Sequence, residues 1–165
     1  MTVLVAYASK HGSTREVAEA IAGALAERGH ASELLPAHEV KTVEAYRAVV
    51  LGGALYTGRW HRDARAFLKQ HRRDLAERPV AVFGLGPRTL APHEVADSRA
   101  QVDKALAAVP EVQPVSLAIF GGVVDPTQLR FPFNRMPASD ARDWDAIEAW
   151  AELVAERLSR STVAS

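Results

Sequence analysis

The 165-residue chain has the length of a single domain, and its 48% hydrophobic content is typical of soluble globular proteins. Its twenty basic and twenty acidic residues cancel, so no overall field would attract nucleic acid or an anionic membrane. Cysteine is absent, which excludes disulfides, thiolate metal sites, iron–sulfur ligation and a cysteine nucleophile.

The predicted elements alternate between strands and helices. Residues 2–9, TVLVAYAS, are apolar almost throughout, as in a parallel strand that is buried on both faces. Apolar positions then recur at helical spacing through 14–28, and Gly29 follows as a stop signal. Further strands are predicted at 31–37, 47–56, 79–86 and 114–122, and further helices at 61–76, 92–109 and 141–159.

The N-terminus enters its first apolar run without a basic leader region, and no apolar stretch approaches the ~20 residues of a membrane span. We therefore expect a cytoplasmic protein that is neither exported nor membrane-spanning. One domain is expected over 1–160, followed by a frayed tail at 161–165.

Five strands alternating with helices indicate right-handed crossovers and a doubly wound parallel sheet of the α/β class. Ligands of such sheets bind outside the carboxyl ends of the strands, near the point where the strand order reverses. The candidate ligand-binding residues therefore follow the first, third and fourth strands: Ser9, Lys10, His11, Gly12, Ser13, Thr14, Ala54, Leu55, Tyr56, Thr57, Gly58, Leu85, Gly86, Pro87 and Arg88.

The turn after the first strand has two interpretations. A helix that begins near Ser13 or Thr14 presents unpaired amides and a partial positive charge, which suit an anion. Hydroxyl donors at Ser9, Ser13 and Thr14, with close backbone approach at Gly12, would cradle one phosphate. Alternatively, Ser13 and Glu16 form a capping box, which requires no ligand. This turn alone leaves both interpretations open.

Other proteins with this architecture are excluded by their motifs. The chain has no G-x-G-x-x-G dinucleotide loop, no G-x-x-x-x-G-K-S/T phosphate loop and no G-x-S-x-G nucleophile elbow. A receiver domain would need carboxylates after the first and third strands, where this chain has small or apolar residues. The histidines show no metal-ligand spacing, so no metal is predicted. A monophosphate loop without catalytic machinery remains.

ASKHGST at 8–14 resembles the flavodoxin phosphate loop, S/T-x-T-G-x-T, which wraps the 5′-phosphate of FMN. Ser9, Gly12 and Thr14 match this pattern, and His11 replaces the usual threonine. The resemblance implies a flavodoxin-like doubly wound three-layer sandwich with a five-stranded parallel sheet in the order 2-1-3-4-5. It also implies non-covalently bound FMN, with its ring between the loops around Tyr56 and Gly86.

Two further segments, GGALYTGRWHRDARAFLKQH at 52–71 and DARDWDAIEAWAELVAERL at 140–158, resemble the menaquinone-dependent protoporphyrinogen dehydrogenases, a flavodoxin-like family. That resemblance implies a flavin-dependent oxidoreductase that passes electrons or hydride through FMN to a quinone- or porphyrinogen-type partner. The basic and aromatic segment LRFPFNRMP at 129–137 is either an ordinary loop over the sheet edge, or a lid over the flavin or a docking patch for an apolar substrate, a quinone or a membrane surface. The resembling dehydrogenases carry a longer segment there.

Two alternatives remain: a flavodoxin-type electron carrier between protein partners, and a flavin-free α/β binding module. Carrier flavodoxins are usually strongly acidic and dock on basic reductases, so the neutral charge favours the enzyme. The expected partners are an electron donor or acceptor protein or a small-molecule oxidant, and no nucleic acid. The flavin itself would carry the chemistry, so no catalytic side chain is assigned.

Individual side chains near the predicted loops carry narrower expectations. Tyr56 is expected beside the flavin ring, whereas Trp60 is expected to pack as core under the following helix. Trp144 falls at helical spacing with later apolar residues and is expected to anchor the last helix in the core. Arg59, His61 and Arg88 are candidate substrate contacts; for His61 a place in the first turn of the helix is favoured.

Overall fold

The computed structural model describes residues 2–9, 12–56, 59–87, 90–124 and 139–164. Strands and helices alternate through these residues, and a short 3-10 helix, η1, follows the second strand. The elements are β1 (Thr2–Ala8), α1 (Ser13–Glu27), β2 (Ser32–Pro36), η1 (Ala37–Glu39), β3 (Tyr46–Tyr56), β4 (Arg59–Trp60), α2 (Arg62–Gln70), α3 (Arg72–Leu75), β5 (Val80–Leu85), α4 (Pro92–Ala107), β6 (Ser116–Phe120), β7 (Val123–Val124), β8 (Ser139–Asp140) and α5 (Trp144–Ala164).

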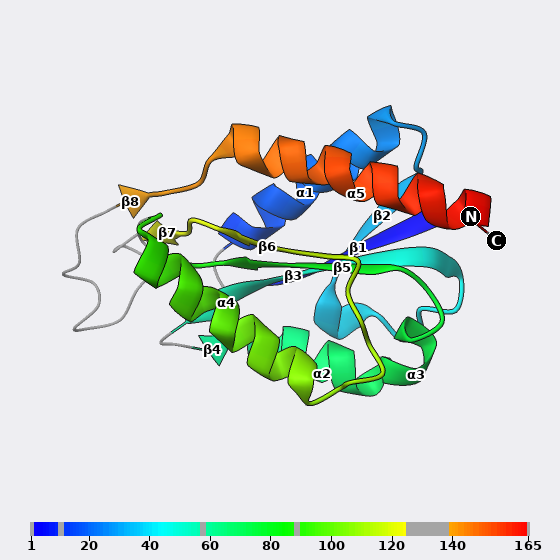
Figure 1. Ribbon diagram of the computed structural model, residues 1–165, viewed down its shortest axis with the longest axis horizontal. Helices are drawn as coiled ribbons and strands as arrows, with labels where there is room; N and C mark the ends of the chain where they lie inside the picture. Colours follow the sequence, from blue (N-terminus) through cyan, green and yellow to red (C-terminus); the bar gives the residue numbers. More distant parts are fainter. Residues whose placement is uncertain (1, 10–11, 57–58, 88–89, 125–138, 165) are drawn as a thin grey trace.

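The central sheet has the strand order β2-β1-β3-β5-β6, with all of these neighbours parallel. When only these parallel strands are numbered, the order is 2-1-3-4-5, so the flavodoxin-like α/β fold is confirmed. Helices α1 and α5 cover one face of the sheet, and α2, α3 and α4 cover the other (Figure 1). The order reverses at β1, which lies between β2 and β3.

Each face of the sheet has its own apolar core because the strands are apolar on both sides. On the α1 and α5 face, the rings of Phe83, Phe120 and Trp150 meet with centroids 5.7–5.9 Å apart. On the opposite face, Trp60 and the α2 residue Phe67 are buried in the second core. The apolar runs that predict the strands therefore become the two interiors of a three-layer sandwich.

Two consecutive glycines in β3 make room for large rings in both layers. A Cβ atom at Gly52 would lie 2.0 Å from Cζ of Phe83, on the α1 and α5 face. A Cβ atom at Gly53 would lie 2.6 Å from Nε1 of Trp60, on the other face. The absence of side chains at Gly52 and Gly53 therefore lets Phe83 and Trp60 pack against the centre of the sheet.

The largest differences from the sequence-based expectation are in two predicted helices. The helix expected at 61–76 is divided at His71 into α2 and α3. The last helix begins at Trp144 rather than 141, because the Ala141 amide donates to the Gly122 carbonyl and Asp143 caps the helix by accepting from the Ala146 amide. It continues to Ala164, so helical backbone extends into the segment expected to be a tail.

The expectation for Trp144 is wrong. This side chain is 41% exposed, whereas Trp150, two turns into the helix, is 7% exposed and packs in the core. Trp144 occupies the first position of α5, and the Arg142 guanidinium lies over its ring, 4.9 Å from the centroid.

None of the helices that the structure describes combines the length and the apolar composition that a membrane span needs.

Candidate functional site

The candidate site lies where β1, β3 and β5 end. Ala8 pairs with Gly53, and Ala54 pairs with Leu85, so the three carboxyl ends meet at one edge of the sheet. The structure places these sequence-predicted residues at that edge: Ser9, Gly12, Ser13, Thr14, Ala54, Leu55, Tyr56, Leu85, Gly86 and Pro87. The other five, Lys10, His11, Thr57, Gly58 and Arg88, lie outside the described residues, as does the 129–137 segment.

Gly12 shapes the turn between β1 and α1. Its φ angle of +84° lies in the left-handed region, which a side chain would strain, and it occupies the N-cap position of α1. Its amide donates to Oγ of Ser9 across 3.1 Å, which holds the turn together. Among the described residues, a Cβ atom at Gly12 would meet nothing within 4 Å, so this part of the structure leaves the backbone open on that side.

The first turn of α1 contains a buried hydroxyl that has no partner in the described part of the structure. Thr14 is fully buried, and among the described residues nothing bonds to its Oγ1. Leaving a buried polar group unsatisfied costs about 1–3 kcal/mol. The first amides of α1 also lack intrahelical acceptors and carry the positive end of the helix dipole. This end of α1 therefore has donors and charge suited to an anion.

The capping-box alternative does not form in the described part of the chain. The N-cap residue is Gly12, which has no side-chain bond to the helix. The Glu16 amide donates to the Gly12 carbonyl, as in an ordinary helical turn. The Glu16 carboxylate accepts from Nη1 of Arg142 instead of reaching back to the cap. Helix capping by Ser13 and Glu16 therefore does not account for the polar residues of this turn.

The hairpin of β3 and β4 forms a second side of the site. Leu55 pairs with Trp60, and Tyr56 pairs with Arg59. Trp60 is 1% exposed, and its indole N–H donates to the Gly53 carbonyl across 3.0 Å. The prediction that Trp60 is a core residue is confirmed.

His61 forms the start of α2 beside this hairpin. Its amide donates to the Ala54 carbonyl, and its Nδ1 accepts from the Asp63 amide at 2.9 Å. Burial lowers the pKa of His61, which favours the neutral ring that this accepting role requires. His61 thus caps α2, as expected of a residue at the start of this helix.

A third side is built from backbone hydrogen bonds between loops. The Gly86 amide donates to the Phe120 carbonyl across 3.1 Å, and the Gly122 amide donates to the Pro87 carbonyl across 2.9 Å. A Cβ atom at Gly86 would lie 2.3 Å from Cβ of Leu55, so the loop after β5 closely approaches the end of β3. The loop after β5 is therefore held by hydrogen bonds to Phe120 and Gly122 on one side and lies against Leu55 on the other.

Sequence reasoning missed the cluster around Arg142. This side chain is only 10% exposed, and its guanidinium binds Asp140 at 2.8 Å and Glu16 at 3.1 Å. The hydrogen bonds that Arg142 donates to the Asp140 carboxylate lower the pKa of that carboxyl and raise the pKa of Arg142. The cluster ties the first turn of α1 to the segment before α5, and no local sequence pattern could indicate it.

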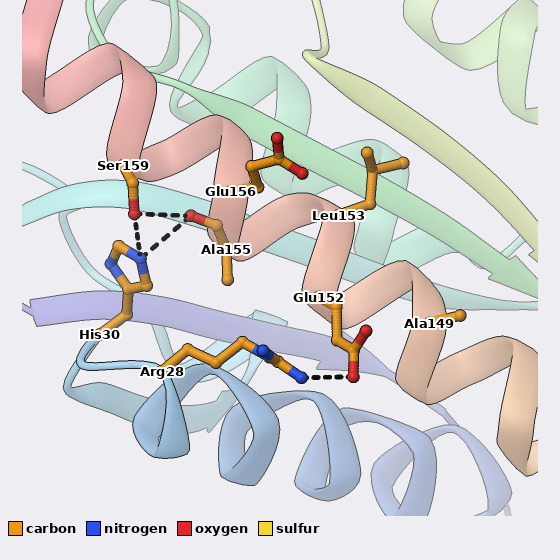
Figure 2. A pocket seen from close by; sticks show the side chains of 8 residues that line it. All are labelled: Arg28, His30, Ala149, Glu152, Leu153, Ala155, Glu156 and Ser159. Carbon is orange, nitrogen blue, oxygen red and sulfur yellow. Dashed lines mark hydrogen bonds and ion pairs between the residues drawn. The ribbon is translucent and has the colours of Figure 1, made fainter.

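A separate surface pocket of about 500 Å³ lies between the loop that follows α1 and the middle of α5, near the amino ends of the strands (Figure 2). His30 Nε2 lies 3.0 Å from both the Ala155 carbonyl and Ser159 Oγ, and its Nδ1 contacts the Arg47 guanidinium. Arg28 pairs with Glu152 at the pocket rim. These polar groups are bonded to one another, so we assign no ligand to the pocket.

Comparison with protein families gives a match over most of the chain. The family model described as a flavodoxin domain matches residues 4–136. Among curated proteins, the quinone-dependent protoporphyrinogen IX dehydrogenase of Escherichia coli strain K12 is 29% identical over 87 residues. That match spans 52% of this chain and 48% of the enzyme, about half the length of each.

Solved structures agree in fold over nearly the whole chain. A flavodoxin from the domain Archaea has a TM-score of 0.65 with 15% identity, and the match covers 96% of this chain and 99% of that one. Oxidised flavodoxin 2 from Bacillus cereus has a TM-score of 0.62 with 23% identity, and the coverages are 95% and 99%. The arrangement of layers is therefore shared with complete flavodoxin chains.

Proposed function

The chain belongs to the flavodoxin-domain family of FMN-type redox proteins, and we propose that the turn from Ser9 to Thr14 binds the 5′-phosphate of FMN. The observation that carries this proposal is the fully buried Thr14 hydroxyl without a partner in the described chain. It lies in the first turn at the positive end of α1, two residues after the open backbone of Gly12. A bound phosphate would supply the acceptor that this hydroxyl lacks.

The remaining predicted residues are assigned to the ring. We place the flavin ring between the loops around Tyr56 and Gly86. Gly86 lets these loops approach, and the hairpin of β3 and β4 brings Tyr56 to the same edge. Residues 10–11, 57–58 and 88 complete the proposed site on the basis of the sequence alone.

Bound FMN supplies electron or hydride transfer, so the protein needs neither a nucleophile nor a general base. The side chains and amides of this chain bind the phosphate and hold the ring at the sheet edge. Backbone groups of the Gly86 loop, fixed by bonds to Phe120 and Gly122, present constant dipoles to that edge. Such fixed dipoles set the electrostatic environment of a redox cofactor without reorganising during the reaction.

We further propose that the protein is an oxidoreductase acting on a quinone- or porphyrinogen-type partner. The match to the quinone-dependent protoporphyrinogen IX dehydrogenase supports this class over half of the chain. The neutral net charge also supports it, because carrier flavodoxins are usually acidic. Oxidation of a porphyrinogen releases electrons and protons, and a quinone that accepts two of each becomes a hydroquinone.

Titration of the deflavinated protein with FMN tests the cofactor site, with riboflavin as the phosphate-free control. We expect FMN to bind far more tightly than riboflavin. Thr14→Val keeps the side-chain shape but removes the hydroxyl, so it should weaken FMN binding by about tenfold and leave riboflavin binding unchanged. Thr42→Val is the matched control, because the Thr42 hydroxyl lies away from the site, where it accepts from the Glu44 amide. Equal binding of FMN and riboflavin would contradict the phosphate site.

Steady-state kinetics of the FMN-loaded protein separate an enzyme from a carrier. Oxidation of a porphyrinogen with a short-chain quinone as acceptor, and no other protein present, would support the oxidoreductase. Reduction that requires a separate reductase, with no turnover of either small molecule, would instead assign an electron carrier between protein partners. Failure to bind FMN at all would leave a flavin-free binding module.

A further inference from the structure

The positive charge of this neutral chain is concentrated in one short segment. Residues 59–73 contain six Lys or Arg residues and one Asp, so the rest of the chain carries a net negative charge. We call these six side chains the basic stripe: Arg59, Arg62, Arg65, Lys69, Arg72 and Arg73.

Helical spacing places the stripe on the solvent side of α2. Ala64, Phe67 and Leu68 are buried against the sheet, so the positions between them face outward. Arg62 and Lys69 lie two turns apart on that outer side, and the Arg62 side chain is 87% exposed. Helix α3 continues the stripe beyond His71, the residue between α2 and α3.

Most of this charge is not compensated. In the segments that the structure describes, Arg59, Lys69, Arg72 and Arg73 form no ion pair. Arg62 is 3.9 Å from Asp63, a weak pairing, and that carboxylate also lies 3.8 Å from His38. Uncompensated like charges on one face create a local positive potential even when the net charge is zero.

The opposite face carries the opposite sign. Helices α1 and α5 lie across the sheet from α2 (Figure 1). The described side chains of α5 include four acidic and two basic residues, and α1 contains three acidic residues and one basic residue. The molecule is therefore an electrostatic dipole, whose positive side would orient it toward an anionic surface.

The stripe begins at the candidate cofactor site. Arg59 pairs with Tyr56 in the hairpin of β3 and β4, and Arg62 opens α2 directly afterwards. Arg65 donates from Nε to the Trp60 carbonyl across 3.1 Å, which anchors the stripe to the hairpin. A partner that lies along α2 would therefore also contact the edge where we place the flavin.

We propose that the basic stripe docks an acidic redox protein that exchanges electrons with the FMN of the proposed site. This inference rests on the proposed function. A protein fits better than a membrane, because the exposed large apolar residues of the described chain, Leu90, Trp144 and Leu153, lie outside the stripe. A surface helix that binds a bilayer inserts its apolar face, whereas that face of α2 is buried against the sheet.

Stopped-flow reduction of the FMN-loaded protein tests the inference, with dithionite-reduced plant-type ferredoxin as an acidic one-electron donor. Plant-type ferredoxins have potentials near about −400 mV, low enough to reduce a flavin. Two ferredoxin molecules are oxidised for each FMN that is fully reduced, with protons taken from the solvent. The variant is Lys69→Glu/Arg72→Glu, and the matched control is Arg99→Glu/Lys104→Glu on the exposed side of α4.

At low salt we expect the stripe variant to lower the second-order rate constant by about tenfold or more, and the α4 control by less than about twofold. The wild-type rate should fall steeply as salt increases, whereas the rate of the stripe variant should not. Equal rates for the two variants would overturn the docking surface. FMN affinity measured on each variant separates this result from failure of the cofactor site, because both variants should bind FMN as wild type does.

Sedimentation with phosphatidylcholine vesicles, with and without phosphatidylserine, distinguishes a membrane surface from a protein. We expect no stripe-dependent retention on the anionic vesicles. Retention that is lost in Lys69→Glu/Arg72→Glu, together with ferredoxin rates that do not depend on the stripe, would reassign the surface to an anionic membrane and overturn the inference.

Discussion

Nη1 of Arg142 lies 3.1 Å from Oε2 of Glu16, which joins the segment before the last helix to the first turn of the first helix. The Arg142 guanidinium also holds Asp140 and covers the exposed ring of Trp144. Because α1 begins with the proposed phosphate turn, this contact couples the far end of the chain to the candidate site.

Replacing Arg142 should destabilise the protein more than replacing an ordinary surface arginine. Arg142→Met removes the hydrogen bonds to Asp140 and Glu16, and we expect a loss of about 1–2 kcal/mol in the free energy of unfolding. Urea unfolding at neutral pH measures it. Arg15→Met removes an ion pair in which both side chains are at least half exposed, so it should cost less than about 0.5 kcal/mol. Equal losses for the two variants would show that the Arg142 cluster contributes no special stability.

Stability should fall in acid because of Asp140. Hydrogen bonds from Arg142 hold the pKa of this carboxyl below its ordinary value of 3.8. A carboxyl with a lowered folded-state pKa stabilises the fold above its unfolded-state pKa, and this contribution is lost as pH falls through the folded value. Urea midpoints measured from about pH 6 to about pH 3 should therefore fall less steeply for Asp140→Asn than for wild type. If the urea midpoints of the two proteins fell equally steeply with pH, Asp140 would not be the group responsible for the loss of stability in acid.

His30 should make the fold sensitive to milder acid. Burial, followed by the charge of Arg47, lowers the pKa of this imidazole from 6.5. Below pH 6.5 the unfolded chain therefore binds a proton that the folded chain resists, so stability falls as pH decreases toward the folded-state pKa.

Urea unfolding at about pH 7 and about pH 5 checks this expectation. His30→Gln retains a polar side chain but cannot titrate, so it should lose less stability over this interval than wild type. His38→Gln, which replaces an exposed histidine, is the control and should behave as wild type does. If the His30 variant loses as much stability as wild type, another group is responsible.

Gly52 should tolerate no side chain. Gly52→Ala places a Cβ atom 2.0 Å from Cζ of the buried Phe83 ring, so we expect a loss of at least about 1–3 kcal/mol. Gly23→Ala is the matched control, because its Cβ would meet nothing within 4 Å on an exposed helical position. This control should stabilise α1 by about 0.5–1 kcal/mol. Thermal and urea unfolding of both variants measure the difference, and a neutral Gly52→Ala would refute the packing argument.

The sequence predicts the layers of this fold better than the details of its edges. Apolar runs such as TVLVAYAS identify the five parallel strands, because burial on both faces leaves a continuous signal. The two-residue strands β4, β7 and β8 are too short for any periodicity, so nothing in the sequence marks them. Trp144 was misplaced because helical spacing identifies a face, but not whether the helix end still lies over the sheet.

The candidate site likewise contains residues that the sequence predicts and residues that it does not predict. Residues next to strand ends, such as Ser9 and Gly86, follow from the architecture, because parallel strands bring their carboxyl ends together. Arg142 could not be found this way, since its partner Glu16 lies 126 positions earlier in the chain. The roles of the individual site residues remain predictions until FMN binding is measured.

The pairing of α1 with α5 also matters during synthesis of the chain. These helices pack together on one face of the sheet, although α1 ends at Glu27 and α5 begins only at Trp144. At translation rates of about 5–20 residues per second, roughly ten seconds separate the emergence of the two helices from the ribosome. During that interval the apolar cluster that contains Val17, Ile21 and Leu25 lacks the residues that α5 contributes to it in the finished protein. A nascent chain that stalls before α5 is therefore a natural target for chaperones and proteases, even though most of its sheet has already been made.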